Sequence, residues 1–172
     1  MRPDTVLVIG YGNDLRGDDA AGPRAACQVA AWHLPHVRVV TQHQLTPELA
    51  EPLAAVGRAV FLDAHVSADG RAPRLRPIAP APPRDGGGHT ADPAGLLALA
   101  RTAYGRAPQA WLLTIPAEAF HFGAPLSPVA ERGVADALAL LRSLLSLSDV
   151  RAPVATGPGS VPDHAGDERT VT

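Results

Sequence analysis

Short apolar runs alternate along this chain with longer segments in which Ala and Leu recur at helical spacing. β-Branched apolar runs of four to six residues are typical of strands buried in a parallel sheet. They predict strands at residues 5–9, 37–41, 59–62 and 110–115, with a weaker one at 74–78. The intervening segments predict helices at about 19–32, from 47, from 93, and from 128 to about 145. The predicted order is therefore β-α-β-α-β-β-α-β-α.

Three of the predicted helices begin with the same local signal. An oxygen-bearing side chain is followed by proline in the pairs Thr46-Pro47, Asp92-Pro93 and Ser127-Pro128. The oxygen can cap a free backbone N–H, and proline loses nothing at the first helical position because its N–H would be unpaired there. These pairs therefore fix three helix starts.

The alternation predicts the fold class. Strands separated by helices form a mostly parallel, doubly wound sheet with helices on both faces, which gives a single three-layer α/β domain. Pro77 places the 74–78 strand at an edge, where a missing N–H costs no sheet hydrogen bond. We assign residues 1–148 to the domain. Residues 149–172 lose all periodicity and are rich in Pro, Gly, Ser and Asp, which predicts a disordered tail.

Composition narrows the function classes. The 172 residues are 46% hydrophobic with a net charge of −2, and all of the basic residues are Arg. Such a chain can bury a core, and it lacks the electrostatic footprint of a nucleic-acid binder. Cys27, the lone cysteine, lies among apolar residues and is expected to be buried in a reducing compartment. No apolar signal segment or membrane span is visible, so we expect a cytoplasmic protein without membrane insertion.

The turn after the first strand, residues 10–19, resembles a nucleotide-binding loop only superficially. Leu15 stands where the dinucleotide pattern needs glycine, and Asp18 stands where the phosphate loop needs lysine. Two carboxylates would also repel a pyrophosphate, so no nucleotide is expected. Asp18 and Asp19 fit a cation, or a water to be deprotonated, better than a phosphate. The alternative is that one of them caps the following helix.

Further candidate ligands follow other strands. Asp63 comes directly after the predicted 59–62 strand, and His89 precedes the helix that begins at Pro93. A metal site made of carboxylates and an imidazole from separate loops at one edge of the sheet is better suited to zinc, nickel or iron than to calcium. We interpret His65 as a loop residue. No nucleophile elbow and no His-Glu-x-x-His motif is present, so acyl-enzyme and zincin mechanisms lack their residues.

Residues 6–19, followed by Gly22, closely resemble the opening signature of the [NiFe]-hydrogenase maturation endopeptidases. Later blocks resemble the same family in the same order, over about residues 4–146. They are residues 45–49, 61–64, His89 ahead of a Leu-rich helix, 114–116, Gly123 and 126–128.

The resemblance implies an α/β peptidase of the aspartate-dependent type that removes a C-terminal extension from the hydrogenase large-subunit precursor. Nickel already inserted in the precursor is then the recognition signal. The family's metal-contacting residues fall on Asp19, Asp63 and His89, and many members carry Glu where this chain has Asp19. The loop at Gly12 and Asn13 is expected to shape the cleft. Asp19 or Asp63 could be the general base, and a non-catalytic nickel-checkpoint chaperone for the same precursor is the alternative function.

Overall fold

A single mixed sheet forms the centre of the protein, whose computed structural model describes residues 2–66, 72–82 and 92–146. Its strand order is β2-β1-β3-β5-β4. The first four strands in that order run parallel, and β4 pairs antiparallel with β5 at the edge. The strands are β1 (Arg2–Tyr11), β2 (Val37–Gln42), β3 (Val56–Val66), β4 (Arg74–Ile78) and β5 (Gln109–Ala117).

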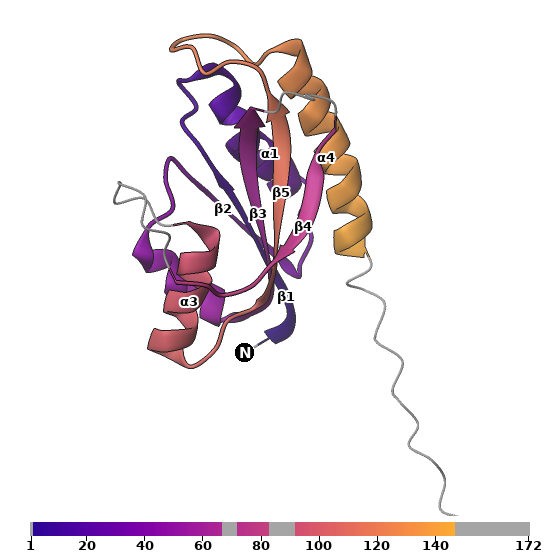
Figure 1. Ribbon diagram of the computed structural model, residues 1–172. Helices are drawn as coiled ribbons and strands as arrows, with labels where there is room; N and C mark the ends of the chain where they lie inside the picture. Colours follow the sequence, from indigo (N-terminus) through magenta and orange to yellow (C-terminus); the bar gives the residue numbers. More distant parts are fainter. Residues whose placement is uncertain (1, 67–71, 83–91, 147–172) are drawn as a thin grey trace, which may run out of the picture.

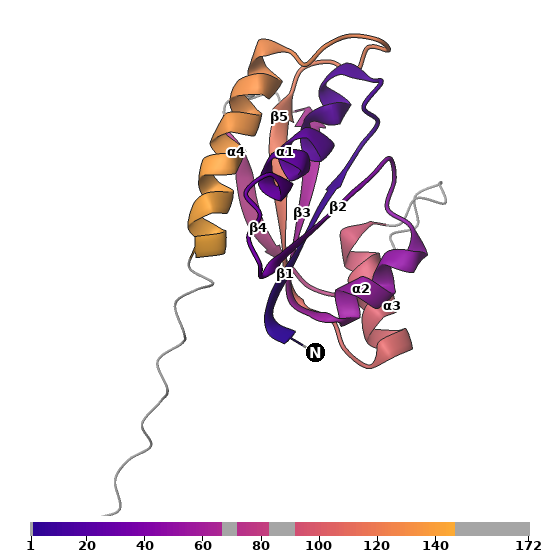
Figure 2. The same ribbon diagram turned by 180° about the vertical axis from the view of Figure 1, so that it is seen from behind.

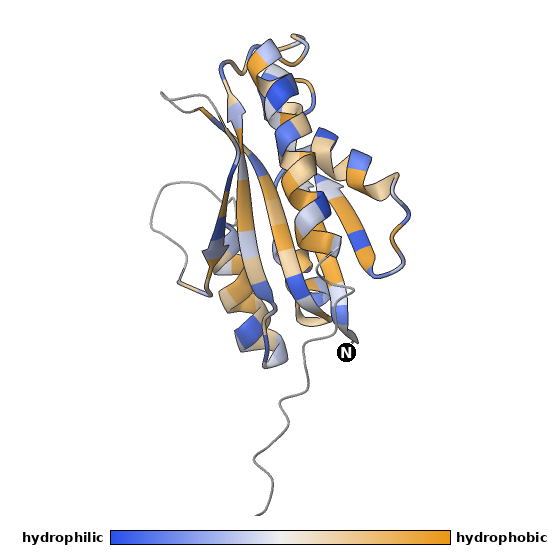
Figure 3. Cartoon of the chain, turned by 90° about the vertical axis from the view of Figure 1, so that its right-hand side faces the viewer, coloured by the Kyte–Doolittle hydropathy of each residue, from blue (hydrophilic) through white to orange (hydrophobic). Residues whose placement is uncertain are grey.

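Within the described residues, four α-helices cover the two faces of the sheet, α1 and α4 on one side and α2 and α3 on the other (Figures 1 and 2). They are α1 (Ala21–Ala30), α2 (Ala50–Ala54), α3 (Pro93–Tyr104) and α4 (Pro128–Ser146). The 3-10 turns η1 (Gly17–Ala20) and η2 (Pro47–Leu49) lead into α1 and α2. Figure 3 shows hydrophobic residues concentrated along the central strands that lie between the two helical layers.

Alternate residues of β1, β3 and β5 contribute to two separate hydrophobic cores, one on each face of the sheet. Val8 and Leu62 face α1 and α4, whereas Ile9 and Phe61 face α2 and α3. Since parallel strands here are buried on both faces, their sequences read as continuous apolar runs rather than as alternating ones. The predicted fold class, element order and edge position of β4 are confirmed.

The strands extend beyond the apolar runs that predicted them. β3 continues to Val66, so Asp63 and His65 lie within the strand and not after it. The interpretation of His65 as a loop residue is therefore wrong. β3 keeps its pairing with β5 as far as Val66, beyond the buried apolar segment, because backbone hydrogen bonds between strands do not require apolar side chains.

Two of the three predicted caps form as expected. The Asp92 carboxylate accepts a hydrogen bond from the Gly95 backbone N–H at 2.6 Å, and the Ser127 hydroxyl oxygen accepts one from the Ala130 N–H at 3.1 Å. Thr46 precedes η2, but its side chain accepts no capping hydrogen bond. Position in the fold decides whether a suitable residue actually caps.

Cys27 is exposed, which contradicts the expected burial. The buried side of α1 is formed by Ala21, Gly22, Ala25, Ala26 and Val29, and Cys27 lies between these positions on the outer face. Within the described ranges no helix is long and apolar enough to cross a bilayer. The predicted tail, 149–172, lies outside the described residues.

Candidate active site at the carboxyl ends of the parallel strands

The loop after β1 folds around the carboxylate of Asp19. The Asn13 backbone N–H donates a hydrogen bond to Asp19 Oδ2 at 2.9 Å, and the Asn13 side chain in turn accepts one from the Leu15 N–H. Gly12 has φ +142°, and a Cβ at this position would overlap the Asp19 carbonyl oxygen. Only glycine fits here, so Gly12 and Asn13 together fix the position of Asp19.

Helix α1 begins unusually close to the strand ends. A Cβ at Gly22 would lie 2.5 Å from the Leu62 carbonyl oxygen and 2.8 Å from that of Tyr11. Glycine therefore lets the first turn of α1 rest directly on the backbone of β1 and β3. This contact brings the Asp19 loop next to the residue that follows Leu62, which is Asp63.

The neighbouring Asp18 has a structural role. Its side chain is 1% exposed and accepts four hydrogen bonds, from the backbone N–H groups of Glu118, Ala119 and Ser127 and from the Ser127 hydroxyl, at 2.6–3.2 Å. Burial alone would raise the pKa of this carboxyl, but the hydrogen bonds outweigh it and hold the pKa below its ordinary value. Asp18 therefore ties η1 to the loop between β5 and α4. Neither Asp18 nor Asp19 supplies a cap to η1 or α1, so the capping alternative is wrong for both.

A row of polar residues crosses the sheet at this level. Gln42 pairs with Tyr11, and Asp63 pairs with Thr114, which also pairs with Arg74. Because Gly10 pairs with Leu62, the residues that follow them, Tyr11 and Asp63, lie side by side and connect these two sets of pairs into one row. On the same face of the sheet, two residues towards the amino ends, the row contains Ile9, Phe61 and Leu112, so the row at Tyr11 and Asp63 marks where this apolar core ends. Functional groups in doubly wound folds gather at this edge.

Asp63 accepts a hydrogen bond from the hydroxyl of Tyr11. Burial raises the pKa of the Asp63 carboxyl to about 6, the hydrogen bond from Tyr11 opposes that rise, and the charge of Asp19 adds to it. Burial and the Asp63 charge together raise the pKa of the Tyr11 hydroxyl far above its ordinary value. Sequence reasoning missed Tyr11. Its position at the end of a strand, one residue before the loop glycine, was the available signal.

The structure thus brings Asp19 and Asp63 together, while His89 lies outside the described residues. Over 2–66, 72–82 and 92–146 no three His, Cys, Asp or Glu side chains converge as a metal site would require. Asp92 lies near enough for its charge to raise the pKa of Tyr11, so α3 begins beside the site. His65 is exposed, and its charge lowers the pKa of Asp63.

Two carboxylates at one edge can do two things chemically. Carboxylate oxygens bind divalent metal ions, and a carboxyl with a pKa near 6 can accept a proton from water close to neutral pH. The fold and the site therefore define a small doubly wound α/β protein with a carboxylate pair at the carboxyl ends of its parallel strands.

The fold is that of the hydrogenase maturation endopeptidases. The chain is similar to the hydrogenase maturating endopeptidase HybD from E. coli, with 21% identity and a TM-score of 0.65 over 84% of this chain and 94% of that one. It is similar to the [NiFe] hydrogenase maturation protease HybD from Thermococcus kodakarensis, with 23% identity and a TM-score of 0.63 over 82% and 99%. The hydrogenase 2 maturation peptidase from Thaumarchaeota archaeon SCGC_AB-539-E09 gives 23% identity and a TM-score of 0.61 over 83% and 99%. No family model and no curated protein matches the sequence.

Proposed function

We propose that this protein is an endopeptidase that removes the C-terminal extension of a [NiFe]-hydrogenase large-subunit precursor. The observation that carries the proposal is the meeting of Asp19 and Asp63 at the carboxyl ends of β1 and β3, in the fold of the maturation endopeptidases. The sequence blocks that resemble this family include both residues.

Nickel enters the proposal as part of the substrate. The precursor presents the ion, and Asp19, Asp63 and His89 contact it. Two carboxylates and one imidazole do not fill the coordination shell of a transition metal, so groups of the precursor complete it. Recognition then depends on nickel having been inserted, so cleavage follows nickel insertion.

Peptide hydrolysis requires a base that takes a proton from the attacking water. Asp63 is suited to this role, because a general base works best when its pKa is near the operating pH and burial raises that of Asp63 to about 6. The water oxygen forms a bond to the scissile carbonyl carbon, the C–N bond breaks, and the released amine receives the proton.

The deciding experiment incubates the purified protein with nickel-loaded precursor and with metal-free precursor. We expect a shortened product only from the nickel-loaded form, with its new C-terminus defined by mass spectrometry. A stable complex without any shortened product would instead identify a nickel-checkpoint chaperone. Efficient cleavage of the metal-free precursor would contradict the nickel dependence.

A further inference from the structure

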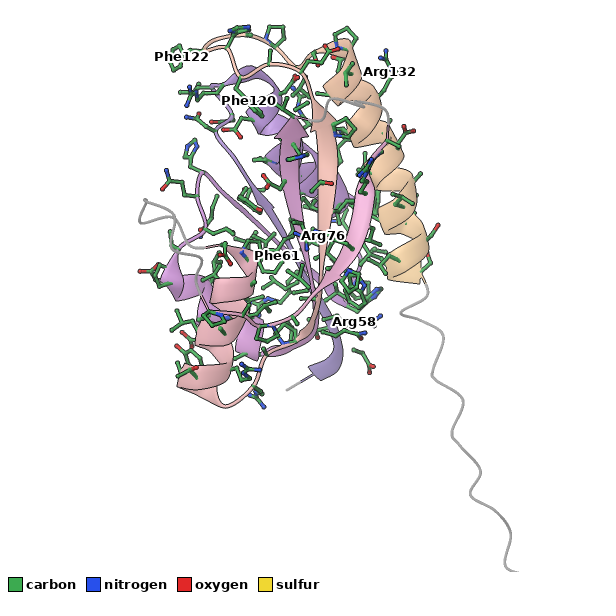
Figure 4. The ribbon with its side chains drawn as sticks, in the orientation of Figure 1. Arg58, Phe61, Arg76, Phe120, Phe122 and Arg132 are labelled. Atoms are coloured by element: carbon green, nitrogen blue, oxygen red, sulfur yellow. The ribbon has the colours of Figure 1, made fainter. Side chains whose placement is uncertain are left out.

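Two large apolar side chains project into solvent beside the site. Phe122, in the loop between β5 and α4, is 78% exposed, and Leu15, in the loop between β1 and η1, is 55% exposed. Figure 4 shows Phe122 at the outer end of its loop, pointing away from the sheet. We call these two residues the apolar lip.

The two loops that carry the lip are fixed to each other. The Gly123 backbone N–H donates a hydrogen bond to the Leu15 carbonyl oxygen at 2.8 Å, and the Asp18 N–H donates one to the Ala119 carbonyl oxygen at 3.1 Å. The Asp18 carboxylate binds both ends of the second loop, at residues 118–119 and at 127. The exposed phenyl ring therefore stands on an ordered base, and ordering it on binding a partner costs little entropy.

The lip is built into the same loop as the carboxylate site. Leu15 lies between Asn13, whose N–H binds Asp19, and Arg16, whose carbonyl oxygen accepts a hydrogen bond from the Asp19 N–H. A protein partner held at the lip therefore lies against the loop that positions Asp19. A projecting aromatic side chain fits a concave apolar pocket, which is how the strongest contacts of protein interfaces are made.

We infer that the apolar lip docks the folded part of the precursor, with Phe122 entering an apolar pocket on its surface. The inference rests on the proposed function, since that function supplies a folded protein partner at this edge of the sheet. The lip holds the partner, while the carboxylates act on the bond to be cut.

The test compares Phe122→Ala and Leu15→Ala with two matched controls that lie away from the site. Tyr104, at the end of α3, is 49% exposed, and Leu140, on α4, is 41% exposed. With nickel-loaded precursor as substrate, we expect Phe122→Ala to raise KM at least about tenfold while kcat stays within about twofold. Leu15→Ala should raise KM less, and Tyr104→Ala and Leu140→Ala should leave it unchanged.

Folding is controlled by the melting temperature, which truncation of such exposed side chains should leave within about a degree of that of the wild type. A folded Phe122→Ala protein with unchanged KM overturns the inference and leaves the proposed function standing. If the wild type binds the precursor without shortening it, the peptidase proposal fails and the dissociation constant replaces KM as the measure of the lip. A wild type that neither binds nor cuts overturns both. A lip that serves only self-association, seen as a dimer that Phe122→Ala converts to monomer, overturns the inference alone.

Discussion

The Tyr11 hydroxyl donates a hydrogen bond to the Asp63 carboxylate, and this contact links the ends of two neighbouring parallel strands. This hydrogen bond uses one acceptor position of the Asp63 carboxylate and leaves the others available to a ligand. The apolar side of Tyr11 packs against the core under α2 and α3. Tyr11 therefore connects the polar site with the hydrophobic core.

The pKa of Asp63 predicts how stability depends on pH. Burial raises it to about 6 in the folded protein, while the unfolded chain keeps a value of about 3.9. The folded protein therefore binds the Asp63 proton more tightly than the unfolded chain does. The stabilisation that this proton gives to the folded state is fully present below about pH 4 and is lost as the pH rises through about 6. Between these two pH values the free energy of unfolding of the wild type should fall by about 1 to 2 kcal/mol through this group, and in Asp63→Asn that fall should be absent. Urea unfolding of both proteins from pH 4 to 7 measures it, and parallel curves would contradict the assignment.

Removing the Tyr11 hydroxyl should raise the pKa of Asp63 further, because the hydrogen bond favours its charged form. We expect Tyr11→Phe to fold and to shift the carboxyl titration, followed by 13C NMR, above about 6. Tyr104, the chain's other tyrosine, is exposed on α3, so Tyr104→Phe is the matched control and should leave that titration in place. A titration of Asp63 that is the same in all three proteins would show that the hydroxyl does not act on it.

Asp18 should contribute strongly to stability without taking part in catalysis. Asp18→Asn replaces one accepting oxygen by an amide that faces hydrogen-bond donors, so we expect a loss of about 2 to 4 kcal/mol in the free energy of unfolding. Asp14 offers the control, since its side chain is 67% exposed and Asp14→Asn should change stability by less than about 0.5 kcal/mol. Because the hydrogen bonds hold the pKa of Asp18 low, its contribution should persist until the pH falls below the ordinary range of a carboxyl.

Gly12 and Gly105 both have positive φ but differ in their surroundings. A Cβ at Gly12 would overlap the Asp19 carbonyl, whereas one at Gly105 would meet nothing within 4 Å. Gly105→Ala should therefore cost only backbone strain, about 1 kcal/mol, and Gly12→Ala should cost more and also displace Asp19. Thermal unfolding and precursor conversion measured together test this difference. Equal losses of stability, with full activity in Gly12→Ala, would show that the loop accommodates a side chain.

Single replacements test the three proposed nickel contacts. Asp19→Ala, Asp63→Ala and His89→Ala should each abolish or strongly reduce processing in a folded protein, since polar side chains of this kind add little to an apolar core. Asp19→Glu should keep much of the activity, because glutamate is the acid that the family resemblance leads us to expect at this position. His65→Ala should lose far less. Precursor conversion on a gel is the measurement, with circular dichroism as the folding control. A fully active, folded Asp63→Ala protein would remove that residue from the site.

The element order and fold class could be predicted from the sequence because they depend on local pattern. An apolar run such as residues 5–9 favours a buried strand whatever its partners are. The pairs Asp92-Pro93 and Ser127-Pro128 determine where helices begin through contacts with the next few residues. The placement of Asp19 and Asp63 near one edge of the sheet could also be predicted from the sequence, since parallel strands end on the same side of a sheet.

Tertiary structure alone decided what each acidic residue does. Asp18 and Asp19 are adjacent and chemically identical in sequence, yet one is buried against the loop between β5 and α4 and the other lies beside Asp63. That difference depends on groups about a hundred residues away, which no local pattern encodes. The same holds for Tyr11, whose partner is set by strand register, and for Cys27, whose exposure depends on which side of α1 meets the sheet. Local propensity acts within a few residues, whereas burial and hydrogen-bond partners are fixed only when distant segments pack together.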